Sequence, residues 1–121
     1  MLRLGNQFEQ ISVVSDQLGS PTYANDLGKV VLQIINNKEF CKKDLQTEIY
    51  NYSNKDEMSW YDFAFKIFKI GKIDCKLTKI RTEEYKTKAK RPKNTIMDKT
   101  KIYRKFDIID RPMSLKFIEN M

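Results

Sequence analysis

The chemistry open to this 121-residue chain is limited first by the absence of histidine, the usual general base and metal ligand at neutral pH. Catalysis would have to use tyrosine, lysine or carboxylate side chains. A tyrosine with a lysine four residues further on would be one suitable arrangement, but none of the six tyrosines has it. The side chains of the adjacent pairs Asp56-Glu57 and Glu83-Glu84 point apart in either a helix or a strand, so a solvated surface explains them well. We therefore predict no catalytic residue in this chain.

The patterns that bind cofactors and metals are also missing. Loops that cradle phosphate need closely spaced glycines, and the four glycines lie 14, 9 and 43 residues apart, so neither GxGxxG nor a P-loop is present. Cys41 and Cys75 form no CxxC pair and are too few for a disulfide framework. We expect them to be buried or incidental thiols, and we predict no metal site.

Positive charge is concentrated in one segment. Residues 86–105 hold nine basic side chains and one acidic one, whereas residues 1–85 hold twelve of each. Such a segment attracts phosphate on nucleic acid, a membrane surface or a nucleotide ligand. A general bias toward lysine, which supplies 18 of the 23 basic residues, explains the charge equally well without any partner. No aromatic residue lies between Lys86 and Lys101 to stack on bases, so a small nucleic-acid-binding module is the weaker alternative.

Composition predicts one globular domain over residues 1–121. Hydrophobic residues make up 40% of the chain and charged residues 32%, which is enough apolar material for a core. No apolar run approaches the roughly 18 residues of a membrane span, and the N-terminus has no signal pattern. We expect a cytoplasmic protein without a membrane partner.

Hydrophobic periodicity predicts an α/β fold with a small sheet and flanking helices. Alternating or β-branched residues predict strands at 11–14, 47–52 and 77–80. Spacings of three and four predict helices over 22–37, 60–70, 98–106 and 114–121, with one helical turn at 82–85. Residues 1–9 are expected to be a loop or a frayed helix end with Gly5 as its C-cap.

Capping residues mark the ends of the expected helices. Ser59 and Asp62 have the spacing of a capping box, and Gly71 is expected to close the same helix. Thr22 or Asn25 is the expected N-cap of the preceding helix, and Pro112 opens the last one. We expect Trp60 and Phe63 to pack in the core. Residues 16–22, 39–46, 53–57 and 86–94 are predicted loops or polar turns.

Two of these loops, residues 16–23 and 88–94, combine hydrogen-bonding side chains with a stiffening proline beside a regular element. A rigid scaffold presents ligand contacts in this way. Proline and polar residues are also common in loops that bind no ligand, so the pattern alone does not decide between a binding loop and a purely structural one.

Four segments in order closely resemble the C-terminal portion of the dTDP-4-dehydrorhamnose reductase family. They are residues 11–27, 49–54, 58–64 and 90–99, and the match covers nearly the whole chain. That family belongs to the extended short-chain dehydrogenase/reductases. Its members use NADPH to reduce the C4 ketone of dTDP-4-dehydro-L-rhamnose, which makes dTDP-L-rhamnose for cell-surface polysaccharides. The resemblance implies an N-terminal Rossmann domain with the catalytic Tyr and Lys, followed by a smaller domain that closes over the nucleotide sugar.

The resemblance implies that this chain is the second part, a substrate domain fragment lacking most of the Rossmann domain. It would bind a dTDP-sugar and be inactive alone. NADPH would be bound by the full-length family enzyme rather than by this chain alone, and the missing Rossmann domain, or a partner chain supplying it, would be the protein partner. Nucleic acid would not be a partner. A regulatory or pseudoenzyme subunit of the same family is a further alternative.

The resemblance also implies which residues bind the substrate. They are Gln17, Ser20, Pro21, Thr22 and Tyr23 in the first loop, and Arg91, Pro92 and Asn94 in the second. The Arg91 guanidinium could make a bidentate contact to a diphosphate, and Lys86, Lys88, Lys90 and Lys93 would add a favourable field. One departure is that residues 111–118 lack the tryptophan expected near the start of the family's final helix.

Overall fold

The computed structural model describes residues 1–40 and 46–115. Their contacts divide the chain into two compact units. Unit 1 contains Met1–Gly19, Glu57–Ile96 and residues 114–115, and unit 2 contains Ser20–Asp56 and Met97–Met113. The expectation of one domain over the whole chain stays a prediction.

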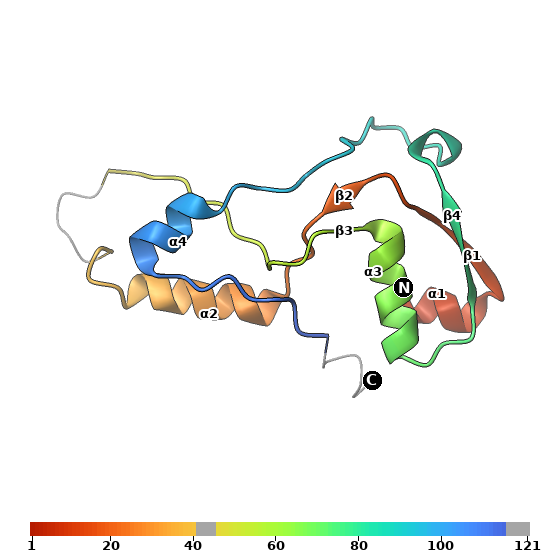
Figure 1. Ribbon diagram of the computed structural model, residues 1–121, viewed down its shortest axis with the longest axis horizontal. Helices are drawn as coiled ribbons and strands as arrows, with labels where there is room; N and C mark the ends of the chain where they lie inside the picture. The colour runs from red at the N-terminus through yellow and green to blue at the C-terminus, as the bar shows by residue number, and fades with distance from the viewer. Residues whose placement is uncertain (41–45, 116–121) are drawn as a thin grey trace. The chain divides into compact units, whose positions relative to one another are not determined.

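Unit 1 is built on a parallel pair of strands, β1 (Gln10–Val14) and β4 (Lys76–Ile80) (Figure 1). The register runs from Gln10 opposite Lys76 to Val14 opposite Ile80. β-branched residues favour these strands, and the predictions at 11–14 and 77–80 are confirmed. A parallel pair requires a long crossover, and helix α3 lies within that connection.

Helix α3 (Trp60–Ile70) forms as predicted. The Ser59 Oγ atom accepts a hydrogen bond from the Asp62 N–H at 3.1 Å, and Asp62 Oδ2 accepts one from the Ser59 N–H at 3.2 Å. This is the predicted capping box, and Gly71 is the C-cap. Ile67 and Phe68 are buried, and the surrounding core includes Phe63, Ile11 and Leu77.

The prediction that Trp60 packs in the core is wrong, because 51% of its surface is exposed. It occupies the first position of α3, and its ring lies 6.5 Å from that of Phe63. Trp60 therefore borders the core cluster of unit 1 and presents much of its ring to the surface.

Helix α1 (Leu2–Gln7) corrects the interpretation of residues 1–9. Gly5 lies inside this helix and is buried, so it is not a C-cap, and Phe8 occupies that position. A Cβ atom at Gly5 would lie 2.7 Å from Phe68 Cζ and 2.8 Å from Ile73 Cγ2. Glycine is needed here because α1 approaches the core of unit 1 too closely for a side chain.

The predicted loop at 16–22 contains a short strand, β2 (Leu18–Gly19), which pairs antiparallel with β3 (Met58–Ser59). The 3₁₀ helix η1 (Thr82–Glu84) confirms the expected helical turn that follows β4. Residues 86–93 form no helix or strand, as predicted, and Asn94 forms an isolated bridge with Leu18.

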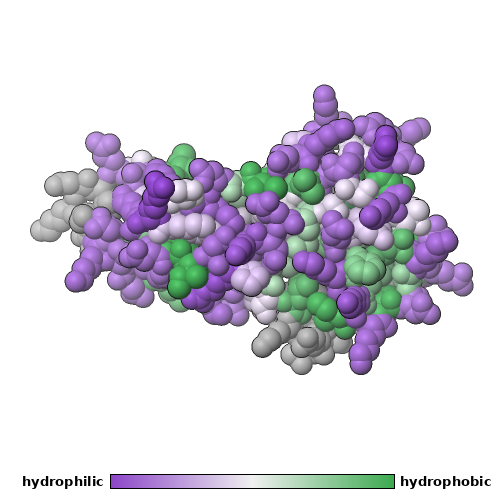
Figure 2. Space-filling model, viewed as in Figure 1, coloured by the Kyte–Doolittle hydropathy of each residue, from purple (hydrophilic) through white to green (hydrophobic). Residues whose placement is uncertain are grey.

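Unit 2 contains two helices, α2 (Ala24–Ile35) and α4 (Thr100–Phe106), both close to their predicted ranges. Its buried core consists of Val30, Ile102, Phe106 and Ile108. The prediction of Thr22 or Asn25 as the N-cap of α2 is wrong, because Tyr23 occupies the N-cap position. The Tyr23 side chain forms no capping hydrogen bond. Several apolar side chains of α2 stay exposed, and Figure 2 shows hydrophobic residues at the molecular surface among the hydrophilic ones.

The strand predicted at 47–52 does not form, because this segment pairs with no strand among residues 1–40 and 46–115. The alternation that suggested it is nevertheless present in the side chains. Tyr50 and Tyr52 pack against the core of unit 2, and Ile49 is 82% exposed. Residues 53–57 form neither helix nor strand, and Ser53 and Asn54 within this predicted polar turn are buried.

The fold class is confirmed as α/β with small sheets and flanking helices. Ser114 and Leu115 are in no helix, and the rest of the helix predicted at 114–121 lies outside the described residues, as does Cys41. Cys75 is a free, half-buried thiol. In residues 1–40 and 46–115, no helix has the length and apolar character needed to cross a membrane.

Two glycine substitutions test the packing of α1. Gly5→Ala should destabilise the chain by about 1–3 kcal/mol through overpacking, although alanine favours helix formation by up to about 1 kcal/mol. Gly28→Ala is the matched control, because Gly28 lies inside α2 with no atom within 4 Å of an added Cβ, and it should stabilise. Urea unfolding measures both. Equal stabilisation by the two substitutions would show that α1 does not pack as described.

Candidate functional site

Unit 1 brings the first predicted loop against the second through backbone hydrogen bonds. The Leu18 N–H donates to Lys93 O at 2.8 Å, and the Thr95 N–H donates to Leu18 O at 3.0 Å. These bonds flank the parallel bridge between Leu18 and Asn94. Two segments more than 70 residues apart in sequence are thus neighbours in space, beside Gln17 on one side and Arg91 on the other.

A polar network fixes the start of the first loop. Asp16 Oδ1 accepts hydrogen bonds from the Thr82 N–H at 2.9 Å and from the Thr82 hydroxyl at 2.7 Å. The hydrogen bond from the Thr82 hydroxyl is the main cause that lowers the pKa of Asp16. Gln17 is buried, and its Nε2 atom donates to Thr82 Oγ1 at 3.2 Å. The orientation of Gln17 is therefore set by η1.

A cavity of about 300 Å³ in unit 1 contains two of the predicted residues, Gln17 and Arg91. Apolar residues of α1 and β1 form much of its lining, and Trp60 and Tyr85 add aromatic rings. Arg91 is the one charged side chain among the described residues that line it. An apolar and aromatic surface with a single cation suits a ligand that has both a flat or apolar part and a negative charge.

Arg91 is available for a ligand. Its side chain is exposed and, within the part of the chain that the structure describes, forms no hydrogen bond or ion pair. Lys93 differs, because its Nζ atom lies 3.5 Å from Glu83 and 3.9 Å from Asp16. Lys93 thus has protein carboxylates nearby, whereas Arg91 forms no ion pair with any described residue.

The other two predicted residues of the second loop have different roles. Pro92 is exposed and stiffens the backbone next to Arg91. The Asn94 Oδ1 atom accepts the Ile96 N–H at 2.8 Å, so this side chain stabilises the local turn. Gln17, Arg91, Pro92 and Asn94 are therefore all placed in unit 1.

The remaining predicted residues, Ser20, Pro21, Thr22 and Tyr23, belong to unit 2. They form the entry to α2. The Thr22 hydroxyl donates to Ser20 O at 3.5 Å, and Ser20 Oγ has no hydrogen-bond partner among the described residues. The Tyr23 N–H donates to Asn54 Oδ1 at 2.9 Å.

Asn54 is the residue that sequence reasoning missed as part of the site. It was expected in a polar turn, but 0% of its surface is exposed. Besides accepting the Tyr23 N–H, it donates through Nδ2 to Asp26 Oδ2 at 2.9 Å and to Arg111 O at 3.2 Å. The only sequence signal was its place in the segment 49–54 that carried the family resemblance.

A second polar cluster in unit 2 supports the backbone around Asn54. The Lys99 Nζ atom donates to Asn54 O and to Asp110 Oδ1, both at 3.2 Å, and only 9% of the Lys99 side chain is exposed. The Tyr103 hydroxyl donates to the same Asp110 oxygen at 2.6 Å. Burial, followed by this carboxylate, raises the pKa of Tyr103, so the phenol stays protonated. These contacts hold the backbone of Asn54 in place.

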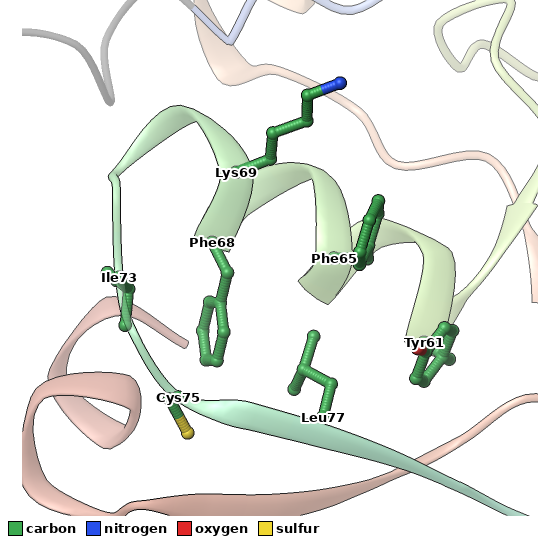
Figure 3. A pocket seen from close by; sticks show the side chains of 7 residues that line it. All are labelled: Tyr61, Phe65, Phe68, Lys69, Ile73, Cys75 and Leu77. Carbon is green, nitrogen blue, oxygen red and sulfur yellow. The ribbon is translucent and has the colours of Figure 1, made fainter.

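A second cavity in unit 1, of about 450 Å³, contains none of the predicted residues. Its lining comes from α3, β4 and the connection between them (Figure 3), and it includes the stacked rings of Tyr61 and Phe65, 6.4 Å apart. Lys69 is the one charged residue among the described residues that line it. In residues 1–40 and 46–115, no three acidic, cysteine or histidine side chains gather as a metal site.

Unit 1 thus combines a small α/β fold with a cavity that Gln17 and Arg91 line. The chain belongs to the RmlD substrate-binding domain family, whose model matches residues 1–118. The predicted family resemblance is therefore confirmed.

Relatives and solved structures agree with this assignment. A dTDP-4-dehydrorhamnose reductase of Aggregatibacter actinomycetemcomitans is 38% identical over 89% of this chain and 38% of its own length. The spore coat polysaccharide biosynthesis protein SpsK of Bacillus subtilis is 34% identical over 80% of this chain and 31% of its own. A crystal structure of the Bacillus anthracis dTDP-4-dehydrorhamnose reductase in complex with NADP matches 98% of this chain and 40% of its own, with a TM-score of 0.81 and 33% identity. The chain spans less than half the length of these relatives.

The network of Asp16 and Thr82 gives a prediction about acid stability. Thr82→Val removes the hydroxyl donor, so the pKa of Asp16 should rise toward its ordinary 3.8, as measured by carboxyl ¹³C NMR. A lowered pKa stabilises the fold above the ordinary value and loses that contribution as pH falls through the folded-state pKa. The wild-type chain should therefore lose more stability on acidification than Thr82→Val. Thr82→Ser, which keeps the donor, should titrate like the wild type, and identical curves for all three chains would contradict the network.

Proposed function

We propose that this chain is the dTDP-sugar-binding part of an NADPH-dependent dTDP-4-dehydrorhamnose reductase that serves dTDP-L-rhamnose biosynthesis. The family assignment and the names of its relatives support the substrate class. The observation that carries the proposal is that Arg91, which has no hydrogen-bond or ion-pair partner among residues 1–40 and 46–115, lines the same cavity as the fixed amide of Gln17.

Arg91 would bind the diphosphate. Its planar guanidinium offers parallel N–H donors that match two phosphate oxygens, and no described residue is bonded to it and has to be displaced first. The exposed Lys86, Lys88 and Lys90 add a positive field around it. Lys93 contributes less, because Glu83 and Asp16 lie close to its ammonium group.

The first loop would contact the rest of the nucleotide sugar. Gln17 offers an oriented amide at its start, and Ser20 and Thr22 offer hydroxyls. Pro21 restricts the backbone between these hydroxyls, which lowers the entropy lost when the loop binds a ligand. Tyr23 fixes the end of the loop at α2.

Hydride and proton transfer would depend on groups outside this chain. Its four glycines do not form a cradle for a dinucleotide, since Gly5 and Gly71 lie against core side chains, Gly19 lies against Thr95, and Gly28 lies within α2. We therefore assign NADPH to the full-length family enzyme and propose that this chain alone is inactive. A Rossmann domain, on the same polypeptide or on a partner chain, would supply the cofactor loop and the catalytic Tyr and Lys.

Titration calorimetry with dTDP tests the role of Arg91. Arg91→Ala should weaken binding about tenfold or more, because a charge-assisted hydrogen bond contributes about 1.5–3 kcal/mol. Arg104→Ala is the matched control, since it removes the same charge from an exposed position on α4 and should leave the affinity unchanged. Equal losses in both variants would show that only net charge matters.

A single-stranded oligonucleotide titrated at two salt concentrations tests the alternative function. We expect the oligonucleotide to bind weakly and to leave the affinity for dTDP unchanged. Tight, steeply salt-dependent oligonucleotide binding without any dTDP signal would replace the proposal by a nucleic-acid-binding module. Turnover of substrate by this chain with NADPH would refute its proposed inactivity.

A further inference from the structure

We infer that Asn54 is a positioning residue that holds the loop of residues 20–23 in its ligand-binding conformation. This inference rests on the proposed function for the identity of the ligand. Asn54 is fully buried and joins two segments of unit 2, namely the start of α2, through the Tyr23 N–H and the Asp26 carboxylate, and the backbone at Arg111. A buried amide that is hydrogen-bonded to both segments fixes their relative positions.

The acceptor side of Asn54 fixes the junction between the loop and α2. Its Oδ1 atom accepts the Tyr23 N–H, and Tyr23 is the N-cap residue of α2. Because no side chain of Tyr23 caps the helix, this contact from a distant residue determines where the loop stops and the helix begins. Pro21, two residues earlier, restricts the backbone on the other side.

The donor side gives the amide one orientation. Nδ2 donates to Asp26 Oδ2 at 2.9 Å and to Arg111 O at 3.2 Å, so both of its hydrogens are used. Turning the amide over would set its oxygen against a carboxylate and a carbonyl, and would set its NH₂ group against an N–H. A leucine would fill the same volume but make none of these bonds, and an aspartate would face the carboxylate of Asp26.

The backbone of Asn54 is held as firmly as its side chain. Lys99 Nζ donates to Asn54 O at 3.2 Å, and the Lys55 N–H donates to Arg111 O at 2.9 Å. Asp110 holds Lys99 in place through its own contact at 3.2 Å. Asn54 therefore has a fixed position of its own, and its Oδ1 atom holds the Tyr23 N–H in place.

Two variants of the full 121-residue chain separate positioning from general stability. Asn54→Ala removes the contacts at the N-terminus of α2. Gln33→Ala is the matched control, because Gln33 Nε2 joins the other end of α2 to Phe106 O and Asp107 O at 3.3 and 3.2 Å. Both should lower the thermal midpoint, so binding is measured at a temperature at which both are folded.

The expected result is specific to the loop. Asn54→Ala should lower the hydrogen-exchange protection of the Tyr23 amide at least tenfold and weaken dTDP binding about tenfold. Gln33→Ala should change neither quantity. If Asn54→Ala leaves both unchanged, or if Gln33→Ala reduces both to the same extent, Asn54 has only a general structural role and the inference is wrong.

Asn54→Asp supplies a conservative test with a pH readout. The new carboxylate keeps an acceptor for the Tyr23 N–H but faces Asp26, while Lys99, Asp110, Arg111 and Tyr52 are the other titratable or charged residues around it. Lowering the pH to the ordinary aspartate pKa of about 4 protonates the introduced carboxyl group, which restores a donor toward Asp26. Protection of the Tyr23 amide should recover in Asn54→Asp and not in Asn54→Ala. Recovery in neither variant would contradict the assigned geometry.

The two readouts also separate this inference from the function on which it rests. If the wild-type chain binds no dTDP, the proposed function fails, and protection of the Tyr23 amide alone decides whether Asn54 holds the loop. If dTDP binds and Asn54→Ala binds it equally well, the proposed function stands and the positioning role is refuted.

Discussion

The candidate site depends on the backbone pairing of Leu18 with residues 93–95. The two hydrogen bonds of Leu18, to Lys93 O and from the Thr95 N–H, attach the start of the first polar loop to the end of the basic loop. They place Arg91, which lies on a segment without helix or strand, in the same cavity as Gln17. Thr82 adds to this arrangement, because its contacts with Asp16 and Gln17 join the loop to the end of β4.

Local signals were sufficient to predict three main elements of unit 1, namely β1, α3 and β4. β1 and β4 were visible as β-branched runs, and α3 was visible because Ser59 and Asp62 form a capping box and Gly71 ends the helix. The substrate loops were found from proline and polar clustering together with the family resemblance. The family assignment supports that resemblance, whereas the roles of the individual side chains stay predictions.

Other features depended on contacts that local sequence does not show. The local sequence predicts a helix cap at Gly5. Glycine is instead needed there because the side chains of Phe68 and Ile73, which are distant in sequence, lie too close for a Cβ atom. Apolar and polar side chains alternate over residues 47–52 as they do in a strand. Tyr50 and Tyr52 pack against the core of unit 2, but no strand among the described residues pairs with this segment. Asn54 resembles a surface turn residue until its partners Tyr23, Asp26 and Arg111 are known.

The most direct test of the account is NMR mapping of amide shifts in this chain as dTDP is added. The account predicts saturable shifts concentrated in residues 17–23 and 91–95, the two loops that hold the proposed substrate residues. Shifts confined to the aromatic cavity of Tyr61 and Phe65, or no saturable shifts at all, would contradict the claim that these loops bind the nucleotide sugar.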